Sequence, residues 1–103
     1  MTAGMSKKDF PEAKVIWKYE IPMTKYFDIM MPQGSTILTV QTQNNRPVLW
    51  AMVDPNASII AKHFVMFGTG YWFKEGDLDG LWRYIGTFQL DDGVHVEHLF
   101  EKI

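Results

Sequence analysis

Short runs of alternating apolar and polar side chains, most of them ended by proline, glycine or asparagine, extend along almost the whole chain. In the first run the apolar positions are Val15, Trp17 and Tyr19, and only Ile16 interrupts the polar side. Pro22 ends this run, because proline has no N–H group to donate to a sheet. The runs are residues 15–21, 26–31, 36–43, 48–53, 62–67, 83–90 and 94–101. They predict an all-β fold: a small antiparallel β-sandwich or partly closed barrel of about seven strands, with at most short helical turns.

Some segments carry more specific expectations. Residues 48–53 are almost wholly apolar, which is typical of a central strand covered on both faces. Residues 91–93, Asp-Asp-Gly, join the last two runs into a hairpin, because these residue types favour tight turns. In that hairpin, one face of the last strand would hold Val94, Val96, His98 and Phe100. Residues 56–62 and 77–82 could each form one helical turn.

The chain of 103 residues is long enough for one domain with one hydrophobic core, which we assign to residues 14–103. Hydrophobic residues make up 47% of the chain, which is typical of a globular protein rather than a disordered one. Residues 1–13 contain lysines but no apolar segment behind them. We therefore expect a flexible N-terminal leader there, and not a secretory signal.

Composition and charge argue against several classes of function. The formal net charge is −2, and residues 75–101 contain seven acidic residues against the single base Arg83. Such a segment repels phosphate backbones, which argues against nucleic-acid binding. No apolar run approaches the roughly 20 residues that span a bilayer, so we expect no membrane association. The chain has no cysteine, which excludes disulfides and thiolate chemistry.

Candidate catalytic and metal-binding residues do not form a recognisable pattern. His95 and His98 lie three residues apart on an expected strand, so their side chains point to opposite faces and cannot easily share a metal. None of Ser6, Ser35 and Ser58 stands in the G-x-S-x-G context of a hydrolase nucleophile. We therefore predict a protein that is not an enzyme and that uses no cofactor or metal.

Three consecutive aromatic residues, Tyr71, Trp72 and Phe73, stand inside the glycine-rich segment 67–80, FGTGYWFKEGDLDG. One interpretation is a loop that folds over one open end of the sandwich. The other is a recognition element, because aromatic faces stack on rings and anchor protein partners. We expect a mixture, in which Tyr71 or Phe73 packs inward and Trp72 reaches a groove or a neighbouring subunit.

Arg46 and Arg83 complete the candidate site, because an arginine next to such a loop could hold an anionic group. The predicted partners are therefore a host protein or a small nucleotide-like ligand. A second copy of the chain is also expected, as a homodimer or higher oligomer. A small all-β domain has exposed edges that must be paired or protected, and seven methionines and four tryptophans exceed the apparent need of one small core.

The ordered motifs VIWKYEIP, IMMPQGSTILTVQTQNNRPVLWAMVDP, FGTG and RYIGTFQLDDGVHVEHLFE cover most of residues 15–101. In this combination the chain resembles a family of short uncharacterised proteins encoded by bacteriophages and prophages. The resemblance implies a non-enzymatic binding protein in the host cytoplasm, which inhibits a host protein, for example a defence protein, or sequesters a small anionic ligand such as a nucleotide. The alternative is a structural or assembly accessory protein of the virion. The resemblance assigns no role to any individual residue.

Overall fold

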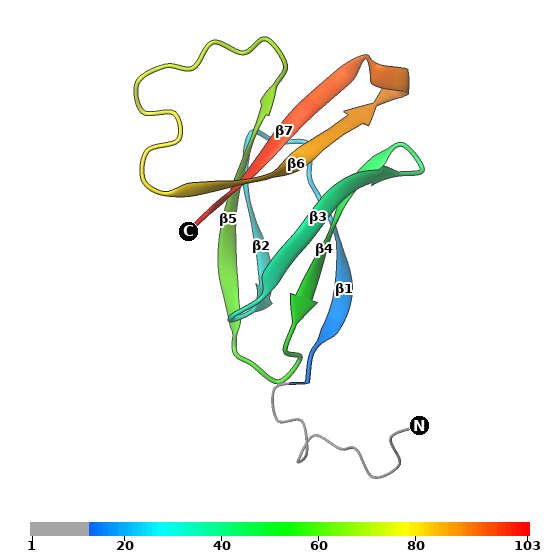
Figure 1. Ribbon diagram of the computed structural model, residues 1–103, viewed down its shortest axis with the longest axis vertical. Helices are drawn as coiled ribbons and strands as arrows, with labels where there is room; N and C mark the ends of the chain where they lie inside the picture. The colour runs from blue at the N-terminus through cyan, green and yellow to red at the C-terminus, as the bar shows by residue number, and fades with distance from the viewer. Residues whose placement is uncertain (1–12) are drawn as a thin grey trace.

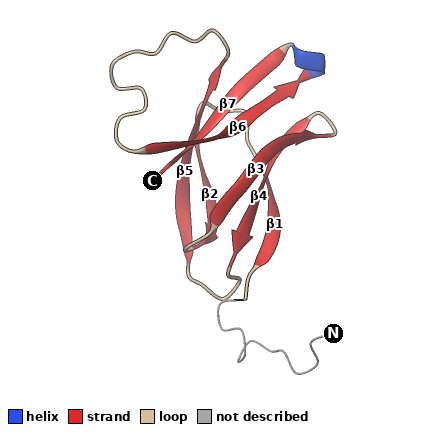
Figure 2. Cartoon of the chain, viewed as in Figure 1, coloured by secondary structure: helices blue, strands red, loops and turns tan. Residues whose placement is uncertain are grey.

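The computed structural model describes residues 13–103, so the expected leader, residues 1–13, lies outside the described residues except for its last position. Seven strands and one short 3₁₀ turn make up the described chain (Figures 1 and 2). They are β1 (Val15–Glu20), β2 (Tyr26–Pro32), β3 (Thr36–Gln43), β4 (Arg46–Val53), β5 (Ile59–Gly68), β6 (Trp82–Leu90), η1 (Asp91–Gly93) and β7 (His95–Lys102). The prediction of an all-β fold with about seven strands is confirmed.

The strands form two antiparallel sheets, one in the order β1-β4-β3 and the other in the order β2-β5-β7-β6. The two sheets pack face to face as a sandwich, and the barrel does not close. As expected, residues 48–53 lie in a central strand, β4, which is flanked by β1 and β3. Leu49 and Val53 are fully buried, whereas Met52 is exposed. On the outer face of β4, Val48 is buried and Trp50 is half-buried, so the expected coverage of both faces holds only in part and is lost at Met52.

The core lies between the two sheets and is built by alternate residues of the facing strands. Phe27 of β2 and Phe64 of β5 stack across it with ring centroids 5.2 Å apart. The buried cluster consists of Ile21, Phe27, Ile29, Met31, Ile37, Val40, Leu49, Ala51, Val53, Phe64, Met66, Phe88, Leu90 and Leu99. Since both sheets contribute to it, the described chain has one continuous core.

The sandwich is nearly closed along one side, where β3 and β6 lie against each other without forming a ladder. Each of these strands has an irregularity in its register, between residues 37 and 39 in β3 and between residues 84 and 86 in β6. A side chain at Gly86 would meet the Val40 methyl group Cγ1 at 3.0 Å, so glycine permits the close approach. The Thr42 hydroxyl group also donates a hydrogen bond to the Gln89 carbonyl oxygen (2.6 Å).

Two local expectations are wrong. Residues 56–62 form no helical turn, because β5 begins at Ile59 and pairs there with Pro32 of β2. Residues 77–82 form non-helical turns that lead into β6 at Trp82. Among the described residues no helix is long and apolar enough to cross a membrane.

The predicted β6–β7 hairpin is confirmed, with η1 as its connection. Its last strand begins at His95, one residue later than expected. Val94 therefore lies in the turn, 76% exposed, and does not share a strand face with Val96, His98 and Phe100.

Candidate functional site

The segment that joins β5 to β6, residues 69–81, is the longest connection between described strands (Figure 1). We call it the β5–β6 loop. In Figure 1 it projects beyond the ends of its two strands. Gly70, Gly76 and Gly80 have φ angles of +88°, +95° and +90°, a backbone conformation that side chains other than glycine rarely adopt. The glycines therefore let the loop reverse direction several times.

Two of the three consecutive aromatic residues fold back from this loop onto β5. The ring centroids of Tyr71 and Phe73 lie 5.0 Å and 4.6 Å from that of Phe67, and 5.3 Å from each other. Phe67 follows the core residue Met66 on β5, so its side chain lies on the outer face of the four-stranded sheet. Tyr71 and Phe73 thus cover the outside of one sheet instead of the end of the sandwich.

Polar contacts hold the same part of the loop in place. Lys25 Nζ donates a hydrogen bond to the Tyr71 hydroxyl oxygen (2.9 Å) and lies 4.4 Å from the centre of that ring. The Tyr71 hydroxyl group in turn donates to Asp77 Oδ2 (2.8 Å), which also accepts the backbone N–H of Lys74 (2.7 Å). Lys25 Nζ is 3.8 Å from the other Asp77 oxygen. The chain of contacts runs from the segment before β2 to the middle of the loop.

These contacts shift two pKa values in opposite directions. The backbone N–H of Lys74, and then the Tyr71 hydroxyl group, lower the pKa of Asp77, because both stabilise the carboxylate. The hydrogen bond to Tyr71 is the main cause that raises the pKa of Lys25. Both groups are therefore charged at neutral pH.

Trp72 points away from the packed pair. Its side chain is 88% exposed, the highest value among the large hydrophobic residues of the described chain. Leu81, at the end of the same loop, is 72% exposed, and its carbonyl oxygen accepts a hydrogen bond from the backbone of the similarly exposed Ile103 (2.8 Å). The β5–β6 loop is therefore held in place by its polar contacts while the indole ring of Trp72 is exposed to solvent.

A hollow of about 400 Å³ lies beside the loop on the outer face of the four-stranded sheet. Besides Tyr71 and Phe73, its lining includes a row of polar groups from the β5–β6 loop, β6 and β7. His98 Nε2 is 2.8 Å from the Thr69 hydroxyl oxygen, and its Nδ1 is 2.7 Å from that of Thr87, which also contacts the Tyr84 hydroxyl group. Sequence reasoning missed this row, because only the pairing of β6 with β7 brings Thr87 opposite His98.

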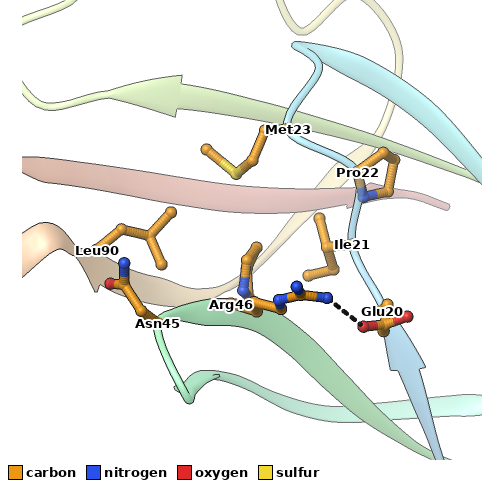
Figure 3. Close-up of a pocket in the computed structure, with 8 residues that line it drawn as sticks. Glu20, Ile21, Pro22, Met23, Asn45, Arg46 and Leu90 are labelled. Carbon is orange, nitrogen blue, oxygen red and sulfur yellow. Dashed lines mark ion pairs between the residues drawn. The ribbon is translucent and has the colours of Figure 1, made fainter.

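Arg46 lies in a different hollow, of about 490 Å³, which is shown in Figure 3. Its guanidinium group points toward Glu20, with 3.8 Å between Nη1 and Oε1, and both side chains are largely exposed. Ile21, Met23 and Leu90 form the apolar part of this hollow. The β5–β6 loop does not contribute to it, so the expected grouping of Arg46 with the aromatic residues does not occur here.

Arg83 lies in a third hollow and contacts Glu101 of β7. The Glu101 side chain is buried, and its Oε2 is 3.0 Å from Lys62 Nζ. Two cations thus neutralise one buried carboxylate, and neither Arg46 nor Arg83 shares a hollow with Tyr71 and Phe73. Sequence reasoning also missed Glu101, since an acidic residue near the end of an amphipathic strand is usually exposed.

Histidine and acidic side chains pair without forming a metal site in the described part of the chain. His63 Nδ1 lies 2.6 Å from Asp28 Oδ1, and His95 Nε2 lies 3.6 Å from Asp91 Oδ2. Within residues 13–103 no three histidine, cysteine or acidic residues are arranged to hold a metal ion.

Comparison with known proteins adds a family without adding a function. Residues 12–103 match the model of a Domain of unknown function (DUF7352). No curated protein and no solved structure matches the chain. The match agrees with the expected resemblance to an uncharacterised family, while the bacteriophage origin stays a prediction.

Proposed function

The chain belongs to the DUF7352 family of domains of unknown function, and from this premise we propose that it is a non-enzymatic protein-binding module. Its recognition element is the β5–β6 loop, with Trp72 as the central contact. The context implied by the sequence resemblance is a bacteriophage protein in the host cytoplasm, where it inhibits a host protein by occupying a surface that this protein needs.

The observation that carries the proposal is the exposure of Trp72 on a loop whose neighbouring residues are fixed. An exposed indole is unfavourable in water, and tryptophan is among the residues that contribute most to protein interfaces. Tyr71 and Phe73 pack on Phe67, and Asp77 holds the loop backbone at Lys74. A side chain presented in this way loses little conformational entropy on binding, so more of the contact energy contributes to affinity.

A protein partner agrees with the charges better than a small anion does. Arg46 faces Glu20 and Arg83 faces the buried Glu101, so both candidate guanidinium groups already have a carboxylate partner. Both ring nitrogens of His98 also have hydroxyl partners in the hollow beside the loop. An anion would have to compete with these contacts, whereas an apolar protein surface would not.

Photo-crosslinking in infected cells tests the proposal. A benzophenone amino acid replaces Trp72 in one variant and Val94 in the other. Val94 is the matched control, because it is 76% exposed but lies in the β6–β7 turn. We expect one discrete adduct with a host protein from position 72 and none from position 94. A virion protein captured at position 72 would favour the structural alternative, and equal patterns from both positions would overturn the proposal.

A further inference from the structure

Strand β1 is an edge strand with an unusual amount of exposed apolar surface. Among the described strands it pairs only with β4, and it lies at the outer side of the three-stranded sheet (Figure 1). Val15 and Trp17 face the interior of the sandwich, opposite the fully buried Val53 and Ala51 of β4. They nevertheless remain 41% and 39% exposed. Within residues 13–103, the core side of the sheet is therefore left partly uncovered along β1.

The other edges of the two sheets are protected. β3 and β6 lie against each other, and both contain register irregularities, which discourage pairing with another chain. β2 ends in Pro32 and carries Asp28 near its middle. β1 has neither a proline nor an irregular register, and Lys18 is its only central charge.

We propose that β1 pairs antiparallel with β1 of a second copy of this chain, across a two-fold axis at Trp17. In this register Lys14 lies opposite the partner subunit's Glu20, and Val15 lies opposite the partner subunit's Tyr19. The dimer would contain one continuous six-stranded sheet, and an oppositely charged pair would close each end of the new ladder. The proposal does not depend on the β5–β6 loop.

Charge selects this register among its neighbours. A shift by two residues in one direction places Lys14 opposite Lys18, and a shift in the other direction places Lys18 opposite itself. Like charges directly opposite each other destabilise a strand pair, whereas opposite charges stabilise it. The same symmetric pairing of β2 about Ile29 would place Asp28 opposite Met30, which gives no complementary charge.

Charge exchange tests both the dimer and its register. Lys14→Glu and Glu20→Lys each create two like-charged pairs in the dimer, and both side chains are exposed. Glu20→Lys also removes the largely exposed pair with Arg46, which contributes little to stability, so the fold should persist in both variants. Sedimentation equilibrium should show dimers for the chain without substitutions. The dimer dissociation constant of each single variant should be at least about tenfold higher. The double variant should dimerise again, and an equimolar mixture of the two single variants should form heterodimers. A monomeric unchanged chain, or dimers insensitive to these changes, would overturn the proposal.

A cysteine at the two-fold axis gives an independent readout, because the chain has no cysteine of its own. Directly opposed residues of antiparallel strands have Cα atoms about 4.5 to 5.5 Å apart, which suits a disulfide bond. Trp17→Cys should therefore form a covalent dimer under mild oxidation, whereas Met30→Cys, exposed on β2, should not. Crosslinking through position 30 and not position 17 would contradict pairing through β1.

Discussion

Tyr71 donates a hydrogen bond from its hydroxyl group to Oδ2 of Asp77, six residues further along the same loop, over 2.8 Å. The same carboxylate oxygen accepts the backbone N–H of Lys74. The Tyr71 ring also packs on Phe67 of β5. Together with Phe73, which also packs on Phe67, Tyr71 attaches the β5–β6 loop to the outer face of the sheet on both sides of the exposed Trp72.

Removal of the Tyr71 hydroxyl group should loosen the loop and leave the sandwich folded. Tyr71→Phe removes two hydrogen bonds, from Lys25 and to Asp77, and we expect it to lower the free energy of unfolding by about 1 to 2 kcal/mol. Hydrogen exchange at the Lys74 amide should accelerate, because its acceptor Asp77 is less well held. Tyr26→Phe is the control, since Tyr26 lies outside the loop and its side chain is exposed. Unchanged exchange at Lys74 would contradict the anchoring role.

The hydrogen bonds that the Asp77 carboxylate accepts in the loop should persist in mildly acidic solution. A carboxyl group with a lower pKa in the folded than in the unfolded protein stabilises the fold above its unfolded pKa, and this contribution is lost as pH falls through the folded pKa. The pKa of Asp77 is lowered from its usual value of 3.8, so the loop should keep its contacts until the pH falls below that value. Carboxyl NMR titration measures this midpoint. It should move upward in Tyr71→Phe, and a midpoint above 3.8 in the unchanged chain would be inconsistent with the contacts.

Alanine substitutions should separate Tyr71 and Phe73, which pack on Phe67, from Trp72, although Phe73 is itself 55% exposed. Trp72→Ala should change the free energy of unfolding by no more than about 0.5 kcal/mol, as is usual for exposed positions. Tyr71→Ala and Phe73→Ala should each cost about 1 to 2 kcal/mol, because each ring loses part of its buried area and its contact with Phe67. Urea denaturation measures all three. Equal losses for the three variants would mean that Trp72 also packs.

Glu101 should contribute more to stability than an exposed acidic residue with a similar partner. Glu101→Gln leaves Arg83 and Lys62 without their shared carboxylate, and we expect a loss of about 2 kcal/mol, which is typical of hydrogen bonds to charged groups. Glu20→Gln is the matched control, because its pair with Arg46 is largely exposed and should contribute less than about 1 kcal/mol. Thermal unfolding of both variants makes the comparison. Similar losses would argue against a special role for the buried carboxylate.

Local pattern was sufficient to predict the strands but not their neighbours. Turn residues and alternation placed the β6–β7 hairpin, whose two strands are close in sequence. The apolar run 48–53 indicated the central position of β4, but not that the distant β1 is one of its neighbours. The burial of Glu101 depends on Lys62 and Arg83, which come from two other strands. No local signal reveals such a pairing. In β7 the buried side chains are Leu99 and Glu101, and they lie on the other face of the strand from the predicted set with Val96, His98 and Phe100.

The candidate site was also only partly predictable. The division of the aromatic triplet followed from the cost of exposing three large rings together. The contact between Tyr71 and Lys25, 46 residues apart, could not be read from sequence, and neither could the engagement of Arg83 by Glu101. The residue types indicated which kinds of group these side chains can bind. Which partner each of them contacts depends on strand pairing and loop conformation, which the sequence pattern does not show.

Calorimetry with the partner identified by crosslinking tests the central claim most directly, that Trp72 is the main contact of a binding loop. We predict that Trp72→Ala weakens binding by about 2 kcal/mol or more, roughly thirtyfold in Kd, as for a central interface tryptophan. Val94→Ala should leave the affinity unchanged, because Val94 is similarly exposed but lies in another turn. An unchanged Kd for folded Trp72→Ala would contradict the account.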